Sequence, residues 1–284
     1  MIIDFHTHTF PEKSCARIVD HLAHVAAITP YTDGSVSGLL SSMKEARIRY
    51  SVTLPVMTRP DQVEKINSSL IENAEYLFSE GIIPFGGLHP DYEDYKEELK
   101  RLKNAGIRGI KLHPAYQNVD FDDIRMLRIL DEASSLGLII LVHAGIDIGL
   151  PTHNFCSVRH ILHVLKDVAP EKLILAHLGN WGCWDEVEYY LTKAPLWFDT
   201  SFSCGKITPL SDSSKKPYRT ELLSFEDFTR IVRKHGTNLV LFGTDSPWSS
   251  QKECVKLLEE MPFTQKEKDQ LFYENAAALL DLKG

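Results

Sequence analysis

The chain has 284 residues, of which 43% are hydrophobic and 25% charged, and its formal net charge is −8. This composition is that of an ordinary soluble protein with one large domain or two small ones. The acidic balance argues against nucleic acid as a partner, because phosphate recognition needs a basic surface. No apolar run reaches the ~20 residues of a membrane span, and the N-terminus does not read as a signal peptide.

The five cysteines are widely spaced, and no pair has Cys-x-x-Cys spacing. This pattern argues against a structural zinc site and against a disulfide framework. Reduced thiols are the simplest interpretation, and they predict a cytoplasmic location.

Short apolar or β-branched runs alternate along the chain with stretches whose apolar residues recur at helical spacing. The runs predict eight strands, near residues 2–5, 50–54, 82–87, 108–112, 138–142, 172–176, 196–199 and 239–242. The stretches between them predict amphipathic helices, among them 62–80, 92–105, 122–136, 157–168, 185–192 and 225–235. Such alternation is typical of a parallel sheet whose strands are joined by helices.

Eight strands of this kind favour a closed (β/α)8 TIM barrel, formed as a single domain over residues 1–284. The alternative is an open doubly wound sheet, which would bind a cofactor where its strand order reverses. No Gly-x-Gly-x-x-Gly motif follows the first strand, and this weakens the alternative. The connection over residues 201–224 is long and polar, and we expect either an active-site lid or a surface loop there.

The active site of such a barrel lies at the carboxyl ends of its strands. His6 and His8 end the first predicted strand, and both point to one side because side chains alternate along a strand. His143 and His177 end the fifth and sixth strands, and Asp245 follows the eighth. Four imidazoles and a carboxylate are typical of a catalytic site for a divalent metal, with zinc as the leading candidate.

Two further polar positions lie beside this set. Lys111 and His113 end the fourth strand and share one face of it. Asp4 lies on the same face of the first strand as His6. Its carboxylate is expected either to orient a ligand histidine or to support the floor of the barrel.

Several motifs follow one another over nearly the whole chain: Asp4-Phe-His6-Thr-His8, Lys111-Leu-His113-Pro114, the strand ends at His143 and His177, and Gly243-Thr-Asp245-Ser-Pro-Trp248. Each motif alone is weak evidence. In this order and spacing, the chain resembles the amidohydrolase superfamily, in the branch of amidohydrolase-related TIM-barrel metal-dependent hydrolases.

The resemblance implies roles for the strand-end residues. His6, His8 and His143 are expected to bind the metal. His177 is expected to bind a second metal or to orient water and substrate. Asp245 is expected to be both a metal ligand and a proton acceptor, so that Asp245 and His177 are the catalytic residues. The implied cofactor is one or two divalent ions, with zinc first and manganese as the alternative.

Lys111 has two interpretations under this resemblance. In binuclear relatives a strand-four lysine, carboxylated by carbon dioxide, bridges two metals. Otherwise Lys111 is an ordinary lysine that holds an acidic substrate or a neighbouring carboxylate. His113 is then a residue that contacts the substrate or supports a ligand. We favour the second interpretation, because mononuclear sites are the commoner expectation in this branch.

The expected function is hydrolysis of a small carbonyl compound, an amide, lactone or ester, by metal-activated water. The first alternative is a non-oxidative decarboxylase of the same superfamily. The second is a PHP-type phosphoesterase, which also opens with paired histidines but carries a late Asp-x-His that this chain lacks. The expected partner is a small-molecule substrate, with no nucleic acid and no membrane. A homodimer is the expected assembly, because barrels of this kind are often dimers.

Overall fold

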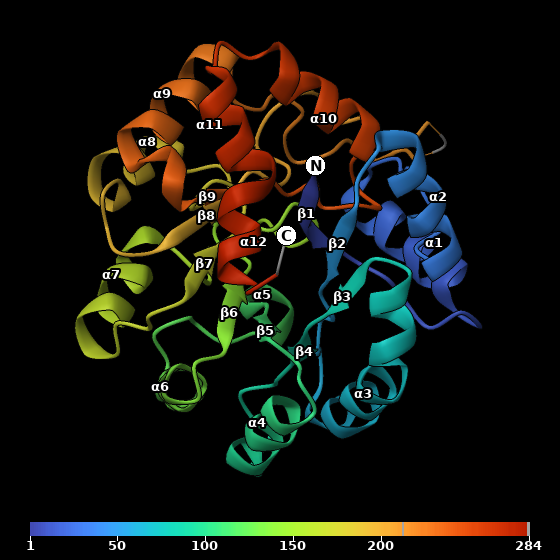
Figure 1. Cartoon of the computed structure of the whole chain (residues 1–284), viewed down its shortest axis with the longest axis vertical. Helices are drawn as coiled ribbons and strands as arrows, with labels where there is room; N and C mark the ends of the chain where they lie inside the picture. Colours follow the sequence, from blue (N-terminus) through green and yellow to red (C-terminus); the bar gives the residue numbers. More distant parts are fainter. Residues whose placement is uncertain (212, 283–284) are drawn as a thin grey trace.

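The computed structural model describes residues 1–211 and 213–282. Its strands lie at the centre, and its helices form a ring around them (Figure 1). The strands are β1 (Ile3–Thr7), β2 (Tyr50–Thr53), β3 (Ile82–Pro84), β4 (Gly86–Gly87), β5 (Gly109–Leu112), β6 (Ile139–Val142), β7 (Leu173–Leu175), β8 (Trp197–Asp199) and β9 (Val240–Leu241). Residues 283–284 of the predicted domain lie outside the described residues, as does residue 212 of the 201–224 connection.

All neighbouring strands pair in parallel, in the order β1-β2-β3 and β4-β5-β6-β7-β8-β9. The sheet closes where β1 meets the end of β9: the backbone N–H of Phe5 donates to the carbonyl of Phe242 at 2.7 Å, and Thr7 pairs in parallel with Ser246. The (β/α)8 barrel predicted from the sequence is therefore confirmed.

One predicted strand is interrupted. The continuous strand expected over residues 82–87 is wrong, because it is divided at Phe85 into β3 and β4. Pro84 has no amide hydrogen to contribute to an unbroken ladder. The chain stays attached to β2 at this point, since the N–H of Phe85 donates to the carbonyl of Thr53 at 3.0 Å. β3 and β4 together occupy one of the eight positions in the barrel.

The helices cover the outside of the strands (Figure 1). The α-helices are α1 (Cys15–Ala26), α2 (Val36–Ala46), α3 (Val63–Ser79), α4 (Tyr95–Asn104), α5 (Pro114–Gln117), α6 (Ile124–Ser135), α7 (Val158–Asp167), α8 (Trp184–Glu186), α9 (Phe225–His235), α10 (Gln251–Glu260), α11 (Gln265–Asp269) and α12 (Asn275–Leu279). Short 3₁₀ segments are η1 (Pro60–Gln62) and η3 (Thr237–Leu239), and π-helical segments are η2 (Val187–Leu191) and η4 (Gln270–Glu274). None of the helices in the described residues has the length and apolarity needed to cross a bilayer.

Local sequence explains where several helices begin and end. Ser224 caps α9 by accepting a hydrogen bond from the N–H of Asp227, and Gly236 follows its last residue. The single helix predicted over residues 185–192 is only partly correct. It begins as α8 and continues as a π-turn, in which the N–H of Thr192 donates to the carbonyl of Val187 at 3.1 Å.

Apolar side chains fill two layers. One lies inside the barrel and includes Phe5, Phe85 and Leu141, with α12 packed against it. The other lies between the strands and the helices. The candidate ligands lie outside these layers, where the carboxyl ends of the parallel strands meet.

His235 in α9 is a buried histidine that serves the fold. Its ring stacks on Phe198 with centroids 3.9 Å apart, its Nε2 donates to the carbonyl of Leu196 at 3.1 Å, and its Nδ1 accepts from the N–H of Lys193 at 3.3 Å. This pairing requires a neutral ring. Burial lowers the pKa of His235 to about 4.

The lowered pKa predicts an acid-sensitive contribution to stability. An unfolded histidine has a pKa of about 6.5, so the unfolded chain takes up this proton first as the pH falls. The stabilisation is fully present above about pH 6.5 and is lost as the pH falls through about 4, a loss of about 3 kcal/mol. Urea unfolding of wild type and His235→Gln at pH 7 and pH 4 checks this. The stability gap between the two proteins should shrink at pH 4, and an unchanged gap would contradict the assignment.

Candidate metal centre

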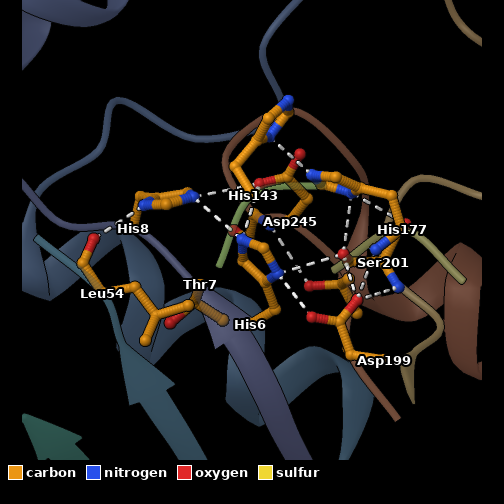
Figure 2. Close-up of polar contacts among 12 residues, drawn as sticks. His6, Thr7, His8, Leu54, His143, His177, Asp199, Ser201 and Asp245 are labelled. Carbon is orange, nitrogen blue, oxygen red and sulfur yellow. Dashed lines mark hydrogen bonds and ion pairs between the residues drawn. The ribbon is translucent and has the colours of Figure 1, made fainter. Parts of the chain in front are cut away.

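The histidines of the first strand meet the loop after β9 at one mouth of the barrel (Figure 2). Nε2 of His6 lies 3.2 Å from Nε2 of His8. Oδ1 of Asp245 lies 3.1 Å from Nε2 of His8 and 3.5 Å from Nε2 of His6. The three side chains are buried, and their ligand atoms are close enough together to hold one ion.

Backbone contacts fix Asp245 in this position. Its N–H donates to the carbonyl of His6 at 2.8 Å, and its carbonyl accepts from the N–H of Trp248 at 2.8 Å. Asp245 has a φ of 66° and His177 a φ of 61°, both in the left-handed region that non-glycine residues seldom adopt. Strained backbone of this kind concentrates at functional sites.

The hydrogen-bond partners of Nδ1 in His6 and His8 determine which nitrogen of each ring carries the lone pair. Nδ1 of His6 lies 2.8 Å from Oδ2 of Asp199, and Nδ1 of His8 lies 2.7 Å from the carbonyl oxygen of Leu54. Both partners are acceptors, so both Nδ1 atoms carry the hydrogen. In neutral rings both Nε2 atoms then present lone pairs to each other.

Such an arrangement fits a divalent cation. Two facing lone pairs repel, whereas two nitrogens bound at about 2.0–2.1 Å to one zinc lie roughly 3 Å apart. Burial, together with the nearby charge of Lys111, lowers the pKa of His6 to about 3, so this ring is neutral at physiological pH. The donor set, two imidazoles and a carboxylate, suits zinc and its transition-metal neighbours.

The other two predicted ligands lie beside this trio. Nε2 of His177 is 2.9 Å from Nδ1 of His143, and the rings of His177 and His6 have centroids 5.3 Å apart. Nδ1 of His177 lies 3.1 Å from the carbonyl oxygen of Ser201, so its hydrogen is on Nδ1 and its Nε2 lone pair faces His143. The structure thus brings together all five residues that the sequence singled out.

Lys111 reaches the same cluster from β5. Its side chain is 1% exposed, and its Nζ lies 3.3 Å from Nε2 of His6. Burial lowers the pKa of Lys111 to about 8. Both interpretations of Lys111, as a bridge between two ions and as the favoured ordinary lysine, stay predictions.

His113 caps α5, and the ring of His143 lies between it and the rest of the cluster. Nδ1 of His113 accepts from the N–H of Tyr116 at 3.4 Å. Its ring stacks on that of His143 with centroids 4.1 Å apart. His113 therefore contacts a predicted ligand, whereas Lys111 approaches the trio itself.

The sequence did not identify the residue that orients His6. That residue is Asp199, the last residue of β8, whose Oδ1 also accepts from the N–H groups of His177 at 3.0 Å and Ser201 at 2.9 Å. The signal was available, since Asp199 ends a predicted strand just as the ligand histidines do. Asp147, four residues after His143, was also missed, because it lies in a loop with no strand or helix periodicity.

Asp4 supports the floor of the barrel. Its carboxylate accepts hydrogen bonds from the side chains of Thr244 at 2.6 Å and Gln251 at 2.7 Å, and from the N–H of His6 at 3.1 Å. These contacts are to backbone and to neighbouring side chains. Of the two expectations for Asp4, the second is therefore the one that its contacts match.

A cavity of about 750 Å³ opens above the cluster. Its floor is formed by the predicted ligands and Lys111. Its walls are largely apolar and include Ile146, Ile148, Trp181, Phe202 and Trp248. Arg17, His21 and Arg59 add basic groups to the lining. A volume of this size suits a small organic molecule.

Among the described residues of the 201–224 connection, for which a lid and a surface loop were both open, Phe202 lines this cavity. The loop is attached to the chain after α1, where the N–H of Thr29 donates to the carbonyl of Thr208 at 2.8 Å and the N–H of Leu210 to the carbonyl of Ala27 at 3.0 Å. These contacts anchor its middle next to the barrel mouth. Closure over the cavity stays a prediction.

Solved structures with the same architecture include the following three. A 2,6-dihydroxybenzoate decarboxylase from Rhizobium is 14% identical, with 100% of this chain and 99% of that chain covered and a TM-score of 0.71. A dihydroxybenzoic acid decarboxylase from Polaromonas, with bound manganese and the inhibitor 2-nitroresorcinol, is 13% identical, with 99% and 97% covered and a TM-score of 0.70. An uncharacterized TIM-barrel protein from Bordetella bronchiseptica is 17% identical, with 99% and 98% covered and a TM-score of 0.73. At these identities the likeness shows a shared fold.

A search of curated proteins finds no match to the chain by sequence. The family model described as amidohydrolase, in contrast, matches residues 3–282. This match spans the paired histidines, the strand-end residues and the late aspartate, and it confirms the resemblance seen in their order. The chain belongs to the amidohydrolase family and is an enzyme.

Proposed function

We propose that this enzyme is a metal-dependent, non-oxidative decarboxylase that acts on a small organic acid with an apolar body. The observation that carries the proposal is a buried ligand cluster beside a buried lysine, at the floor of an apolar cavity. The decarboxylases of similar fold support it, and one of them was solved with manganese. Hydrolysis was the expectation from the sequence, and decarboxylation is now the better-supported choice.

His6, His8, His143 and Asp245 would hold one divalent ion, zinc or manganese, with His177 next to it. When bound, the ion supplies positive charge that anchors and polarises oxygen atoms of the substrate. The outer hydrogen bonds of His6 and His8, to Asp199 and to the Leu54 carbonyl, keep the ligand nitrogens facing inward.

The apolar walls favour loss of carbon dioxide. In the reaction, the bond between the carboxylate carbon and the substrate carbon breaks, and its electron pair stays on the substrate carbon. A proton then takes the place of the carboxylate. Asp245 lines the cavity, and its hydrogen bond to His8 holds its pKa at about 2, so it is ionised; it would first take a proton from water or from a substrate hydroxyl and then pass it to the substrate carbon. Water stabilises the compact charge of a carboxylate more than the dispersed charge that forms when carbon dioxide leaves. Apolar walls such as Ile146 and Trp181 exclude water and so favour that step.

Lys111 would provide a fixed charge in this site. With its pKa lowered to about 8, it is still mainly protonated at neutral pH. An ammonium group 3.3 Å from a ligand nitrogen can stabilise negative charge that develops on the substrate. Arg17, which lines the same cavity, would favour entry of an anion.

Hydrolysis remains the second candidate, and Asp245 is the observation that favours it. Its carboxylate faces the cavity beside two ligand histidines, where it could accept a proton from water. The cluster alone suits both reactions, so the choice between them rests on the cavity above it.

The test is a screen of the metal-loaded enzyme for carbon dioxide release from hydroxybenzoates and related unsaturated acids. Amides, lactones and esters of the same size are screened in parallel. Carbon dioxide release that disappears in His6→Ala would support the proposal. Hydrolysis of an ester or lactone without carbon dioxide release, likewise dependent on His6, would replace it with the second candidate.

A further inference from the structure

Asp147 lies in the loop after β6, at the edge of the candidate metal centre. It is 6% exposed and lines the cavity. Its Oδ1 accepts hydrogen bonds from the N–H groups of Gly149 at 2.9 Å and Leu150 at 3.0 Å. These two bonds fix the carboxylate, so that Oδ2 faces Nε2 of His113 at 3.7 Å and Nε2 of His143 at 3.9 Å.

The two ring nitrogens of His143 face different groups, one the metal centre and the other Asp147. Its Nδ1 faces Nε2 of His177 at 2.9 Å. Its Nε2 is buried and has no hydrogen-bond partner among the described residues, while the side chain as a whole is 9% exposed. Oδ2 of Asp147 is the charged atom that this nitrogen faces.

The two tautomers of His143 differ in how Nε2 interacts with the carboxylate of Asp147. With the hydrogen on Nδ1, a bare Nε2 lone pair would face a carboxylate oxygen, and two acceptors repel in a buried site. With the hydrogen on Nε2, the N–H faces the carboxylate, and the Nδ1 lone pair joins that of His177. The second arrangement repeats the pattern of His6 and His8, whose inner lone pairs face each other while their outer nitrogens face acceptors.

We propose that Asp147 is a positioning residue: its carboxylate holds His143 in the Nε2–H tautomer and so directs Nδ1 toward the metal ion. The proposal rests on the metal centre of the proposed function, but it does not depend on which reaction the enzyme performs. A carboxylate behind a ligand histidine fixes the ring and makes the ligand nitrogen more basic. Asp147 would do for His143 what Asp199 does for His6.

The same three side chains could instead be read as a second metal site, since their ligand atoms lie close together. Two observations argue against this. Nδ1 of His113 accepts from the N–H of Tyr116, so Nε2 of His113 carries a hydrogen. The rings of His113 and His143 are also nearly parallel, with 10° between their planes, so their in-plane lone pairs do not converge on one ion. Asp147 Oδ2 therefore lies opposite the Nε2 atoms of two rings, at 3.7 and 3.9 Å, and does not share a metal ion with them.

Asp147→Asn tests the proposal. The amide oxygen must stay where the N–H groups of Gly149 and Leu150 donate, so the amide NH₂ group takes the position that faces His143. It then presents a donor to Nε2 and favours the opposite tautomer, with the hydrogen on Nδ1. The dissociation constant for zinc, measured by competition with a chelator, should rise ten- to a hundredfold.

The exposed Asp167 at the end of α7 provides a matched control, because Asp167→Asn makes the same chemical change away from the site. Zinc affinity of the control should equal that of wild type. Equal affinity in Asp147→Asn would overturn the proposal, as would two ions in wild type of which Asp147→Asn loses one. Wild type that binds no zinc would instead contradict the proposed function.

A measurement on wild type alone keeps the proposal testable if the variant does not fold. Long-range ¹H–¹⁵N spectra of the histidine rings in the zinc-loaded protein report which nitrogen carries the hydrogen. The expected result for His143 is a protonated Nε2 and an Nδ1 shifted by metal binding. A hydrogen on Nδ1 of His143 would overturn the assigned role of Asp147.

Discussion

Asp245→Asn is expected to lower kcat/KM by about 10³-fold or more while the protein stays folded. The carboxylate provides one of the ligand atoms and, in the proposed reaction, also transfers the proton, a role that alone is typically worth 10²–10⁴-fold. An amide of the same size keeps the packing but cannot carry a proton and is a poorer ligand. The measurement is steady-state kinetics on the acid identified by carbon dioxide release.

Asp131→Asn is the control for that variant, because Asp131 lies exposed in α6, away from the site. Its kinetics should match wild type. Thermal unfolding of both variants would show whether the fold is retained. Undiminished activity in a folded Asp245→Asn protein would remove Asp245 from the catalytic site.

Asp199→Asn is expected to weaken metal binding ten- to a hundredfold and to reduce kcat/KM on the order of 10²–10⁴-fold. Oδ1 of Asp199 accepts from the N–H groups of His177 and Ser201, so the new amide must keep its oxygen there. Its NH₂ group then faces Nδ1 of His6, where the carboxylate Oδ2 accepts a hydrogen bond at 2.8 Å. The ring would shift its hydrogen to Nε2, the nitrogen needed for the ion.

Asp4→Asn provides a demanding comparison, since Asp4 is equally buried but bonds to Thr244, Gln251 and backbone instead of a histidine ring. We expect Asp4→Asn to lower the unfolding temperature without raising the dissociation constant for zinc. If both variants lost zinc affinity to the same extent, the orienting role of Asp199 would be wrong.

The candidate ligands could be grouped from the sequence because a barrel has a simple rule: parallel strands bring their carboxyl ends to one mouth. His6, His143, His177 and Asp245 are far apart in the chain, yet each follows a short apolar run, and that was enough to group them. The family resemblance added the roles. Neither argument required any knowledge of the side-chain contacts.

The residues that orient those ligands were harder to predict. Asp199 is the last residue of its strand, but its neighbours Trp197 and Phe198 make it read as part of a buried strand. Asp147 lies in a loop, where its position depends on two backbone N–H groups and leaves no periodic signal. Asp4 shares a face with His6, yet its carboxylate bonds to Thr244 and Gln251, which lie some 240 residues later in the chain.

Local backbone details were also beyond the sequence pattern. The apolar run at residues 82–87 reads as one strand, but its pairing is divided at Phe85. The run at 185–192 has helical spacing, but part of it adopts π-helical hydrogen bonds. The choice of reaction depends on the cavity walls, which come from residues as distant as Ile146 and Trp248.

The most direct test of the central claim is the number of metal ions per polypeptide in the purified protein, measured by elemental analysis beside Asp245→Asn and Lys111→Met. We predict about one zinc or manganese per wild-type chain, a large loss in Asp245→Asn, and no change in Lys111→Met. Two ions per wild-type chain, falling to one in Lys111→Met, would contradict this account, because Lys111 would then be a bridge between two metals.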